Sequence, residues 1–578
     1  MKKQKVDWGV TVDGVMPLRD PEVACNLLSK DKVIGIDLET TGFSPWKNDI
    51  ALVQMYGQET GTLAVLQVRE GELHPAISKL IASKKKFIVH NGVGFDLLFM
   101  DQAGVDWKRS TWHDTLVGET LLATTGRRDV RKNLQSSLRR RLGKEVNKDI
   151  EHGHWGSAEL TDEQIKYAAQ DVLSLPALYQ AQLAKGIESH QDEALAMEME
   201  LVPIVAQMTL NGLPCTKERM TTYIEGQRVA IEASGKRLHK LFGDINLGST
   251  KQLQVALAKH GINVTSTAKP VLIEISQFGG KAGKIADDLL NWKHGNQRIN
   301  MYDEEWQDEH IIDGKVHPHF WQCSADTTRF TCSDPNLQHI PKDSRGQVIG
   351  GLPGWDVTST DYSQIEVRIA AYLAHDEVLM KLLELGDVHT AVAAAVFGVS
   401  EKSVTPKQRK LAKAMTFLLL FGGGVEGFYN YVRMAGGEID YDEAGGYVRQ
   451  FFATFGGLRL MREHAERLSQ KFGPVFIKLP NGARRILVGW NKKSTTILNT
   501  MVQGTAAVGI KYGMLEADKQ GLTKYLGGQV HDELVSVVPH KEAKEYGKEM
   551  QEAMIKGMHR VLPITVKAET KAGKEWQA

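Results

Sequence analysis

The sequence predicts a multidomain protein in which an α/β unit precedes a larger α+β unit. At roughly 150 residues per domain, the 578 residues suggest three or four domains, or two large ones. Apolar, β-branched runs alternate with helical patterns over residues 1–190, and long amphipathic helical patterns fill 191–310. Mixed helix and strand patterns resume near residue 317 and continue to the end. We therefore expect domain boundaries near residues 190 and 310.

The first unit contains strands bounded by turns and followed by helices. The expected strands are 33–41, 51–57, 62–68 and 87–90. The expected helices are 93–103, 112–124 and 161–184. Thr161 and Gln164 have the spacing of a capping box at the start of the last helix. In the second unit, the segment NGLP at 211–214 interrupts the helical pattern.

Composition excludes several classes of protein. The chain is 42% hydrophobic and 24% charged, which is ordinary for globular proteins and unlike disordered, collagenous or coiled-coil sequences. Four scattered cysteines form neither a disulfide framework nor a zinc-binding spacing. The N-terminus lacks the apolar stretch of a signal peptide, and no apolar run is long enough to span a membrane. We therefore expect a cytoplasmic protein with no membrane association.

The net charge does not identify a partner. Lys and Arg number 71 and Asp and Glu number 70, which leaves a net charge of +1. Carboxylates that bind metal ions would offset the cations of a basic groove, so a nucleic-acid-binding protein remains compatible with this balance.

Acidic residues gather on the strands and helices of the first unit. Asp37 and Glu39 lie two apart on an apolar strand and so share one face. Asp96 follows a second strand, and Tyr167 and Asp171 lie one helical turn apart. A solvated strand end is the alternative for the first pair alone. All four carboxylates together suit a pair of metal ions that hydrolyse a phosphodiester.

These residues carry a resemblance to a known class of nuclease. DLET, Nx₂₋₃(F/Y)D and YxxxD, over about residues 30–185, resemble the motifs of the DEDD-type 3′→5′ exonucleases that have a tyrosine in the third motif. The resemblance implies an RNase H-like α/β fold. It also implies metal ligands at Asp37, Glu39, Asp96 and Asp171, and a tyrosine, Tyr167, that orients the attacking water. Asp114 resembles a further acid of these enzymes, with a helix cap as the alternative.

A basic segment follows in the same unit. Residues 127–149 hold nine Lys or Arg against three acids. They form either a solvated helix face or a surface that guides a nucleic-acid strand.

The second unit contains acids at strand ends and an unusual helix. Asp361 ends an extended segment and precedes a helical pattern within 358–376. His531, Asp532 and Glu533 lie near the start of an expected strand at 527–539. Alone, each acid could belong to a surface turn. Within 407–424, four residues recur every fourth position, so two cations and two aromatic rings share one helical stripe. They are Arg409, Lys413, Phe417 and Phe421. Such a stripe suits binding of a triphosphate and stacking of a base.

These segments resemble motifs A, B and C of the family A DNA polymerases. Further counterparts are INLGSTKQL (245–253), TTRFTCSDPNLQHIP (327–341), DVHTAVAAAVFG (387–398), GARRI (482–486) and NTMVQGTAA (499–507). The resemblance implies a right-hand polymerase at 191–578 after an exonuclease domain at 1–190, with no 5′-nuclease domain. The thumb would occupy about 195–310 and the fingers about 376–479. The palm would combine about 311–375 with 480–578.

The resemblance also implies roles for particular residues. Asp361, Asp532 and the carbonyl of Tyr362 would bind two Mg²⁺ ions, for which Mn²⁺ could substitute, and Glu533 would be an auxiliary acid. Lys413 would protonate the departing pyrophosphate, and Glu366 would exclude a ribose 2′-hydroxyl. The implied nucleotide-binding residues are Arg409, Lys413, Phe417, Phe421, His389, Glu366 and Gln364. The implied contacts to primer–template DNA are Arg329, Asn336, Gln338, Asn499, Gln503 and His531.

The implied function is DNA-directed DNA synthesis from dNTPs with proofreading, in which a single-stranded 3′ end enters the exonuclease site. The resemblance leaves room for a processivity factor as a further partner.

Three residues depart from the family pattern: Phe421 replaces a tyrosine that supports the gate glutamate, Thr328 replaces a glycine, and Thr495 replaces a common arginine. The alternatives are a single-subunit RNA polymerase, a DNA-binding accessory protein and an RNA-processing exonuclease. Glu366 and Phe417 argue against an RNA polymerase. The full set of acids argues against an accessory protein, and motifs A to C argue against an RNA-processing exonuclease.

Overall fold

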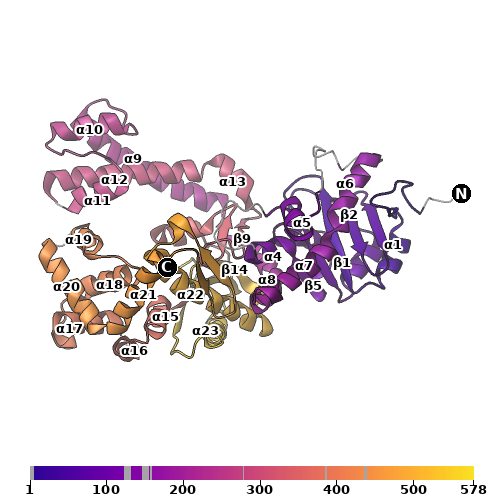
Figure 1. Cartoon of the computed structure of the whole chain (residues 1–578). Coiled ribbons are helices and arrows are strands. Elements are labelled where there is room, and N and C mark those ends of the chain that lie inside the picture. Colours follow the sequence, from indigo (N-terminus) through magenta and orange to yellow (C-terminus); the bar gives the residue numbers. More distant parts are fainter. Residues whose placement is uncertain are drawn as a thin grey trace.

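Two units of sheet and helix lie side by side in the computed structural model (Figure 1). The structure describes residues 6–122, 132–145, 155, 159–277, 279–384, 387–434 and 439–577. Helix α8 (Asp192–Asn211) joins the two units, because it packs against a strand of each sheet. Within the described ranges, no helix is both long and apolar enough to cross a membrane.

The described residues of the first unit form a five-stranded sheet in the order β3-β2-β1-β4-β5. Strand β1 lies at the centre, antiparallel to β2 and parallel to β4. The strands are β1 (Val33–Thr40), β2 (Ile50–Gly57), β3 (Thr62–Gln67), β4 (Lys86–Val89) and β5 (Thr111–Asp114). The first four confirm the strands expected from the sequence, because long apolar runs bounded by turns mark buried strands well.

Helices cover this sheet. They are α1 (Pro21–Leu28), α2 (Pro75–Ile81), α3 (Asp96–Gln102), α4 (Thr115–Leu122), α5 (Leu134–Leu142), α6 (Asp162–Leu173) and α7 (Leu175–Glu188). Helix α6 packs on β1, β2 and β3, which brings its inner face over the centre of the sheet. The capping box predicted at Thr161 and Gln164 is confirmed at the start of α6.

Two expected helices were wrong in their bounds. The helix expected at 112–124 begins at Thr115, because residues 111–114 form edge strand β5, which pairs with β4. The helix expected at 161–184 is two helices, which meet at Ser174 just before Pro176. A proline fits the first turn of a new helix but not the interior of a continuing one.

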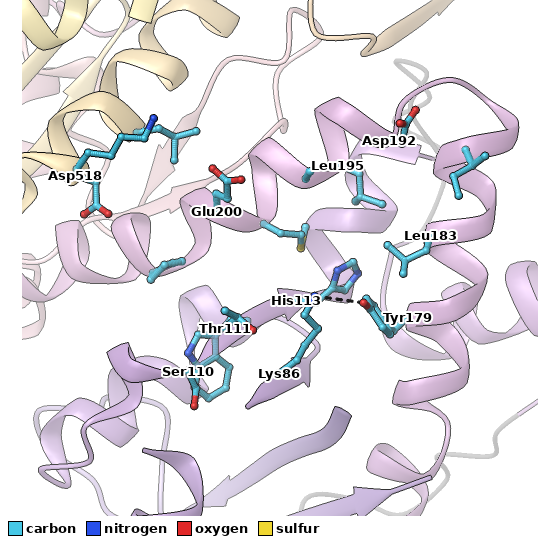
Figure 2. A pocket seen from close by; sticks show the side chains of 17 residues that line it. Lys86, Ser110, Thr111, His113, Tyr179, Leu183, Asp192, Leu195, Glu200 and Asp518 are labelled. Carbon is cyan, nitrogen blue, oxygen red and sulfur yellow. Dashed lines mark hydrogen bonds between the residues drawn. The ribbon is translucent and has the colours of Figure 1, made fainter. Parts of the chain in front are cut away.

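A cavity of about 690 Å³ lies where the two units meet (Figure 2). Its walls come from β4, β5, α7 and α8 and from the C-terminal end of a long helix of the second unit. His113 and Tyr179 line it together, and Lys86 Nζ lies 3.4 Å from the Tyr179 hydroxyl.

Long helices follow α8 and form the upper left of the molecule in Figure 1. They are α9 (Lys217–Phe242), α10 (Thr250–Lys259), α11 (Lys269–Gln277), α12 (Gly280–Met301) and α13 (Glu304–His310). Helices α9 and α12 pack along each other, and a separate apolar core joins them to α10 and α11.

The second unit contains a four-stranded sheet in the order β14-β15-β11-β16. Its strands are β11 (Trp355–Tyr362), β14 (Leu526–Val530), β15 (Glu533–Pro539) and β16 (Ala568–Gly573). Helices α22 (Ser494–Lys519) and α23 (Ala543–His559) pack on each other, and α23 also packs on the sheet. The single strand expected at 527–539 was wrong: a turn at His531, which has φ of 58°, divides the segment into a hairpin.

Most of the remaining helices lie in the lower left of Figure 1. The remaining helices are α14 (Arg345–Val348), α15 (Ile365–Leu373), α16 (Glu377–Glu384), α17 (Val388–Phe397), α18 (Pro406–Leu420), α19 (Val425–Met434), α20 (Tyr441–Thr454) and α21 (Gly456–Gln470). The short strands are β6 (Leu213–Pro214), β7 (Ile311–Ile312), β8 (Lys315–Val316), β9 (His319–Trp321), β10 (Thr331–Ser333), β12 (Val475–Lys478) and β13 (Arg484–Leu487).

Candidate functional site

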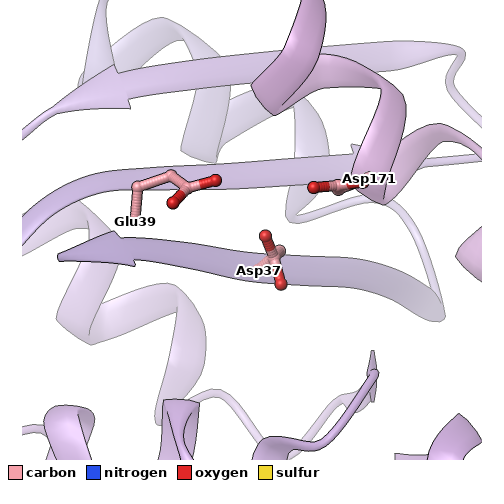
Figure 3. A group of neighbouring side chains, drawn as sticks. All are labelled: Asp37, Glu39 and Asp171. Atoms are coloured by element: carbon pink, nitrogen blue, oxygen red, sulfur yellow. The ribbon is translucent and has the colours of Figure 1, made fainter. Parts of the chain in front are cut away.

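Three carboxylates meet over the centre of the first sheet (Figure 3). Asp37 and Glu39 extend from one face of β1, and Asp171 reaches them from α6. One oxygen from each residue lies within 4.8 Å of the others. The strand period of two and the packing of α6 on β1 therefore bring together three of the acids that the sequence singled out.

Asp96 lies near this group but is not one of the three residues whose oxygens lie within 4.8 Å of one another. It is the first residue of α3, only 2% exposed, and it lies close enough to Glu39 for their charges to interact. Burial, with the charges of Asp114 and Glu39, raises the pKa of Asp96 to about 8 although backbone N–H groups donate to it. Its Oδ1 has no hydrogen-bond partner among the described residues. A buried carboxylate oxygen without a partner among the described residues, close to Glu39 of this group, fits a divalent cation, which prefers hard oxygen ligands.

Tyr167 and Asp114 are the two other residues that the sequence singled out in this unit. Tyr167 lies one turn before Asp171 on α6, and its ring lies 5.9 Å from that of Trp155. Asp114 is fully buried and accepts from the backbone N–H groups of Asn91, Val93 and Leu116 at 2.9–3.1 Å. Asp114 therefore caps α4 and fixes the loop before Asp96, as the alternative for this residue predicted.

The basic segment at 127–149 lies partly outside the described residues. In its described part, Arg140 and Arg141 on α5 form ion pairs with Glu119, whose side chain is fully buried. These two arginines link α5 to α4 through the buried carboxylate of Glu119.

A second acidic pair lies at the edge of the other sheet. Asp361 stands near the end of β11, and Asp532 stands in the β14–β15 turn, where its carbonyl accepts from Tyr362 N at 3.3 Å. Burial, followed by the charges of Asp532 and Glu533, raises the pKa of Asp361 to about 7. Burial and the charge of Glu366 raise the pKa of Asp532 to about 6. Two carboxylates that repel each other at a strand end offer a site for cations.

Glu533 lies beside this pair but is engaged in a buried network. Its carboxylate accepts from Arg345 at 2.8 Å, from Trp576 Nε1 at 2.7 Å and from the Ser359 hydroxyl. Arg345 and Trp576 could not be identified from the sequence, because nothing in their local pattern indicates that they meet Glu533 across the fold.

The cationic and aromatic stripe lies on α18. Arg409, Lys413 and Phe417 share one face of this helix, whereas Phe421 is the residue that follows its last turn. Arg409 is paired with Asp387 at 2.6 Å, and this pair holds the pKa of Asp387 well below its usual range. The His389 ring lies 6.0 Å from that of Phe417, and burial and Lys413 lower the pKa of His389 to about 4.

Glu366 has a partner that the sequence did not predict. Arg329 Nη2 donates to Glu366 Oε1 at 2.6 Å, so the carboxylate at the first turn of α15 is fixed. Gln364 immediately precedes α15 and adopts a left-handed backbone conformation with φ of 56°.

The remaining candidate DNA contacts gather around the β14–β15 turn and α22. Gln338 Nε2 donates to the Gln529 carbonyl at 3.3 Å, and the Gln529 side chain donates to the His531 carbonyl at 2.6 Å. Asn336 Oδ1 accepts from Gln338 N at 3.0 Å and so fixes the same segment. Asn499 and Gln503 lie one turn apart on α22.

The two centres together define a class of protein. Acids at the end of β11, in the same unit as a helix (α18) that presents cations and an aromatic ring and packs on α15, suit nucleotidyl transfer. The acids over the other sheet suit phosphodiester hydrolysis. This arrangement is that of a nucleic-acid polymerase with an attached nuclease.

Comparison with known proteins identifies the family. Residues 217–578, more than half of the chain, match the model of DNA polymerase family A, and residues 14–187 match a 3′-5′ exonuclease model. The chain belongs to DNA polymerase family A and carries a 3′-5′ exonuclease domain.

The relatives support this assignment. The chain is 28% identical to DNA polymerase I of Aquifex aeolicus over 96% of its own length and 97% of the relative. It is 27% identical to DNA polymerase I of Pseudomonas aeruginosa over 95% of its length, but it spans only 64% of that relative. Its fold matches a structure described as the POL domain of Pol1 from M. smegmatis in complex with DNA primer-template and dNTP. The TM-score is 0.80 at 22% identity, over 97% of this chain and 99% of that one.

Proposed function

We propose that this chain copies a DNA template by adding dNTPs to a primer 3′-hydroxyl and removes mispaired 3′ ends in its exonuclease domain. The observation that carries the proposal is the placement of two carboxylates at one end of the second sheet: Asp361 lies near the end of β11, and Asp532 lies in the adjoining β14–β15 turn, where its carbonyl accepts from Tyr362 N. Carboxylates in this arrangement are stabilised by divalent cations.

In the polymerase centre, Asp361, Asp532 and the carbonyl of Tyr362 would hold the cations. When bound, two such ions activate the 3′-hydroxyl and neutralise the transferring phosphates. We propose Mg²⁺, for which Mn²⁺ can substitute, because all the ligands are hard oxygen atoms. Glu533, which Arg345, Ser359 and Trp576 hold in place, would be an auxiliary acid beside this pair.

The residues of α18 would receive the nucleotide. Arg409 exchanges Asp387 for the triphosphate, with His389 alongside, and Lys413 donates a proton to the departing pyrophosphate. Phe417 stacks on the base and sugar. Glu366, fixed by Arg329, occupies the space that a ribose 2′-hydroxyl would need.

The exonuclease centre would act on a single-stranded 3′ end. Asp37, Glu39, Asp96 and Asp171 hold its cations, and Tyr167 orients the attacking water from the same helix face as Asp171. The exonuclease domain is proposed to span 1–190, and the polymerase 191–578. The thumb lies at about 195–310, the palm at about 311–375 and 480–578, and the fingers at about 376–479. We place the protein in the cytoplasm, where it meets primer–template DNA and any processivity factor.

A primer-extension assay tests the proposal. A 5′-labelled primer on a longer template is incubated with Mg²⁺, with and without the four dNTPs. We expect extension to template length with dNTPs, shortening from the 3′ end without them, and neither in EDTA. Shortening in both lanes with Mg²⁺ would contradict the polymerase assignment, and activity that persists in EDTA would contradict the role of the carboxylates.

A further inference from the structure

The β12–β13 hairpin and its flanks expose large aromatic side chains that no role described above uses. We define this hairpin surface as residues 471–493. Phe472 is 100% exposed, Phe476 62% and Trp490 75%, although rings of this size are normally at least partly covered. The Cβ atoms of Phe476 and Ile486, and those of Lys478 and Arg484, share one face of the hairpin because these pairs lie opposite each other.

The same segment is strongly basic. Residues 471–493 contain six Lys or Arg and no acid. Arg485 turns inward and pairs with Asp326 at 2.8 Å. Three other cations of this segment are exposed, and none of them forms an ion pair with a described residue: Lys471, Lys478 and Lys493. The surface therefore combines exposed rings with cations that have no acidic neighbour in sequence.

The hairpin is held firmly against elements of the proposed polymerase centre. Leu479 contacts Gly504 of α22, one residue after Gln503. Arg485 binds Asp326, three residues before Arg329. Lys492 Nζ donates to the Gly473 carbonyl at 3.1 Å, which ties the flank that carries Phe472 to the flank that carries Trp490. The rings thus lie on a rigid support beside residues proposed to contact DNA.

We infer that this surface binds the unpaired template strand ahead of the primer terminus. Exposed rings among cations are the recognition chemistry of single-stranded nucleic acid, because every base offers a face for stacking and every nucleotide a phosphate. Template-directed synthesis always leaves one such strand beside the polymerase centre, and that strand is the template. The inference rests on the proposed function, since it assigns a further subsite to the same reaction.

A binding assay with matched DNA tests the inference. One labelled duplex has a 20-nucleotide 5′ template overhang, and a second has a one-nucleotide overhang. Fluorescence anisotropy is measured in EDTA, so that no strand is cut. We expect the wild-type protein to bind the long overhang more tightly. In Phe472→Ala/Phe476→Ala/Trp490→Ala this preference should fall by about tenfold for each base that loses its stacking partner.

The charge contribution is measured separately. In Lys471→Gln/Lys478→Gln/Lys493→Gln, the slope of log K against log salt for the long overhang should decrease by about 2, because each phosphate contact on a single strand contributes about 0.7. Phe476→Tyr should retain binding because it keeps a ring. Trp355→Ala, which removes a partly exposed tryptophan at the start of β11, is the matched control and should bind like wild type.

The outcomes separate this inference from the proposed function. Single-nucleotide extension on the one-nucleotide overhang should be equal in wild type and the triple aromatic variant. If wild type does not extend, the proposed function fails, whereas the anisotropy still reports whether the hairpin binds single strands. An unchanged overhang preference in the triple aromatic variant would overturn the inference. The inference would also be overturned if the triple aromatic variant lost affinity only for a duplex with a frayed 3′ primer tail.

Discussion

At the scale of single residues, the partner of Glu366 explains a departure from the family pattern. By the resemblance, a tyrosine is expected at position 421, whose hydroxyl would support Glu366, and Phe421 lacks that hydroxyl. In this chain, Arg329 supplies a charge-assisted hydrogen bond of 2.6 Å, and both side chains are about one-fifth exposed. Bonds of this kind are roughly twice as strong as neutral ones. The carboxylate is therefore fixed without the tyrosine.

Glu366→Ala should weaken discrimination against ribonucleotides. We expect the ratio of ribonucleotide to deoxynucleotide kcat/KM to rise by about 10- to 200-fold, because losing a small steric contact changes discrimination between two substrates by about this factor. Single-nucleotide insertion measures it. Phe421→Tyr is the matched control and should change the ratio by less than about threefold, because Arg329 already holds Glu366. An unchanged ratio in Glu366→Ala would contradict the role of this residue.

His113 should make the exonuclease domain sensitive to mild acid. Its Nε2–H donates to Gln182 Oε1 at 2.9 Å, because the Gln182 amide donates to the Thr115 carbonyl. Burial lowers the pKa of His113 from its ordinary value near 6.5 to about 4. Below pH 6.5 the unfolded chain binds this proton more readily than the folded chain. Stability present above pH 6.5 is therefore lost as the pH falls toward 4.

Urea unfolding of wild type at pH 7 and pH 5 measures this loss. His113 should contribute about 2 kcal/mol of it, from a pKa difference of more than two units. His113→Gln removes the titrating group, so the pH dependence of its unfolding should be smaller by that amount. Equal pH dependence in the two proteins would show that His113 is not responsible.

At the scale of elements, a buried ion pair fastens α8 to α22. Lys511 and Glu198 have side chains that are 0% and 1% exposed. Lys511 also donates to the Thr328 carbonyl at 2.8 Å, and Gln322 donates to Glu198 at 2.9 Å. The network therefore joins the helix between the two units to the helix that carries Asn499 and Gln503.

Removing one partner of this pair should destabilise the junction strongly. Lys511→Met leaves a buried carboxylate without its cation and should lower the free energy of unfolding by about 3–5 kcal/mol. Lys511→Met/Glu198→Leu removes both charges and should recover much of that loss. Denaturant unfolding of the three proteins provides the comparison. A double variant less stable than the single variant would show that the charge itself is not the cause.

Local pattern predicts elements well where one signal dominates. The strands of the first sheet and the cap of α6 follow from apolar runs and from the Thr161–Gln164 spacing. The signal fails at 111–114, where pairing with β4 outweighs a helical pattern, and at 531–532, where a left-handed residue turns the chain. Strand pairing and positive φ depend on the surrounding fold, so the sequence of the segment alone does not reveal them.

The same limit applies to the candidate sites. Asp37, Glu39 and Asp171 could be predicted to meet because strand and helix periods place them on facing surfaces. Arg345 and Trp576, which bind Glu533, lie far from it in sequence, and neither belongs to a chemical motif. The ion pair between Arg409 and Asp387 likewise joins two helices. Pairings of this kind depend on tertiary packing.

At the scale of the whole molecule, the two acidic centres belong to different sheets with separate supports. Asp37, Glu39 and Asp171 are held by β1 and α6, whereas Asp361 and Asp532 are held by β11 and the β14–β15 turn. Substitutions more than about 10 Å apart with no shared partners are usually independent in energy. Each proposed activity should therefore be removable without the other.

Asp532→Ala should abolish primer extension, with a loss of at least about a thousandfold in rate, while 3′ digestion stays within about twofold of wild type. Asp37→Ala/Glu39→Ala should do the reverse. Both variants are assayed on one 5′-labelled primer–template, with and without dNTPs. Asp356→Ala, at the far end of β11, is a control for effects on the sheet alone.

Extension retained in Asp532→Ala would remove that residue from the polymerase centre, and digestion retained in the double variant would remove the β1 acids from the exonuclease centre. Loss of both activities in either variant would mean that the two sheets depend on each other, contrary to their separate supports.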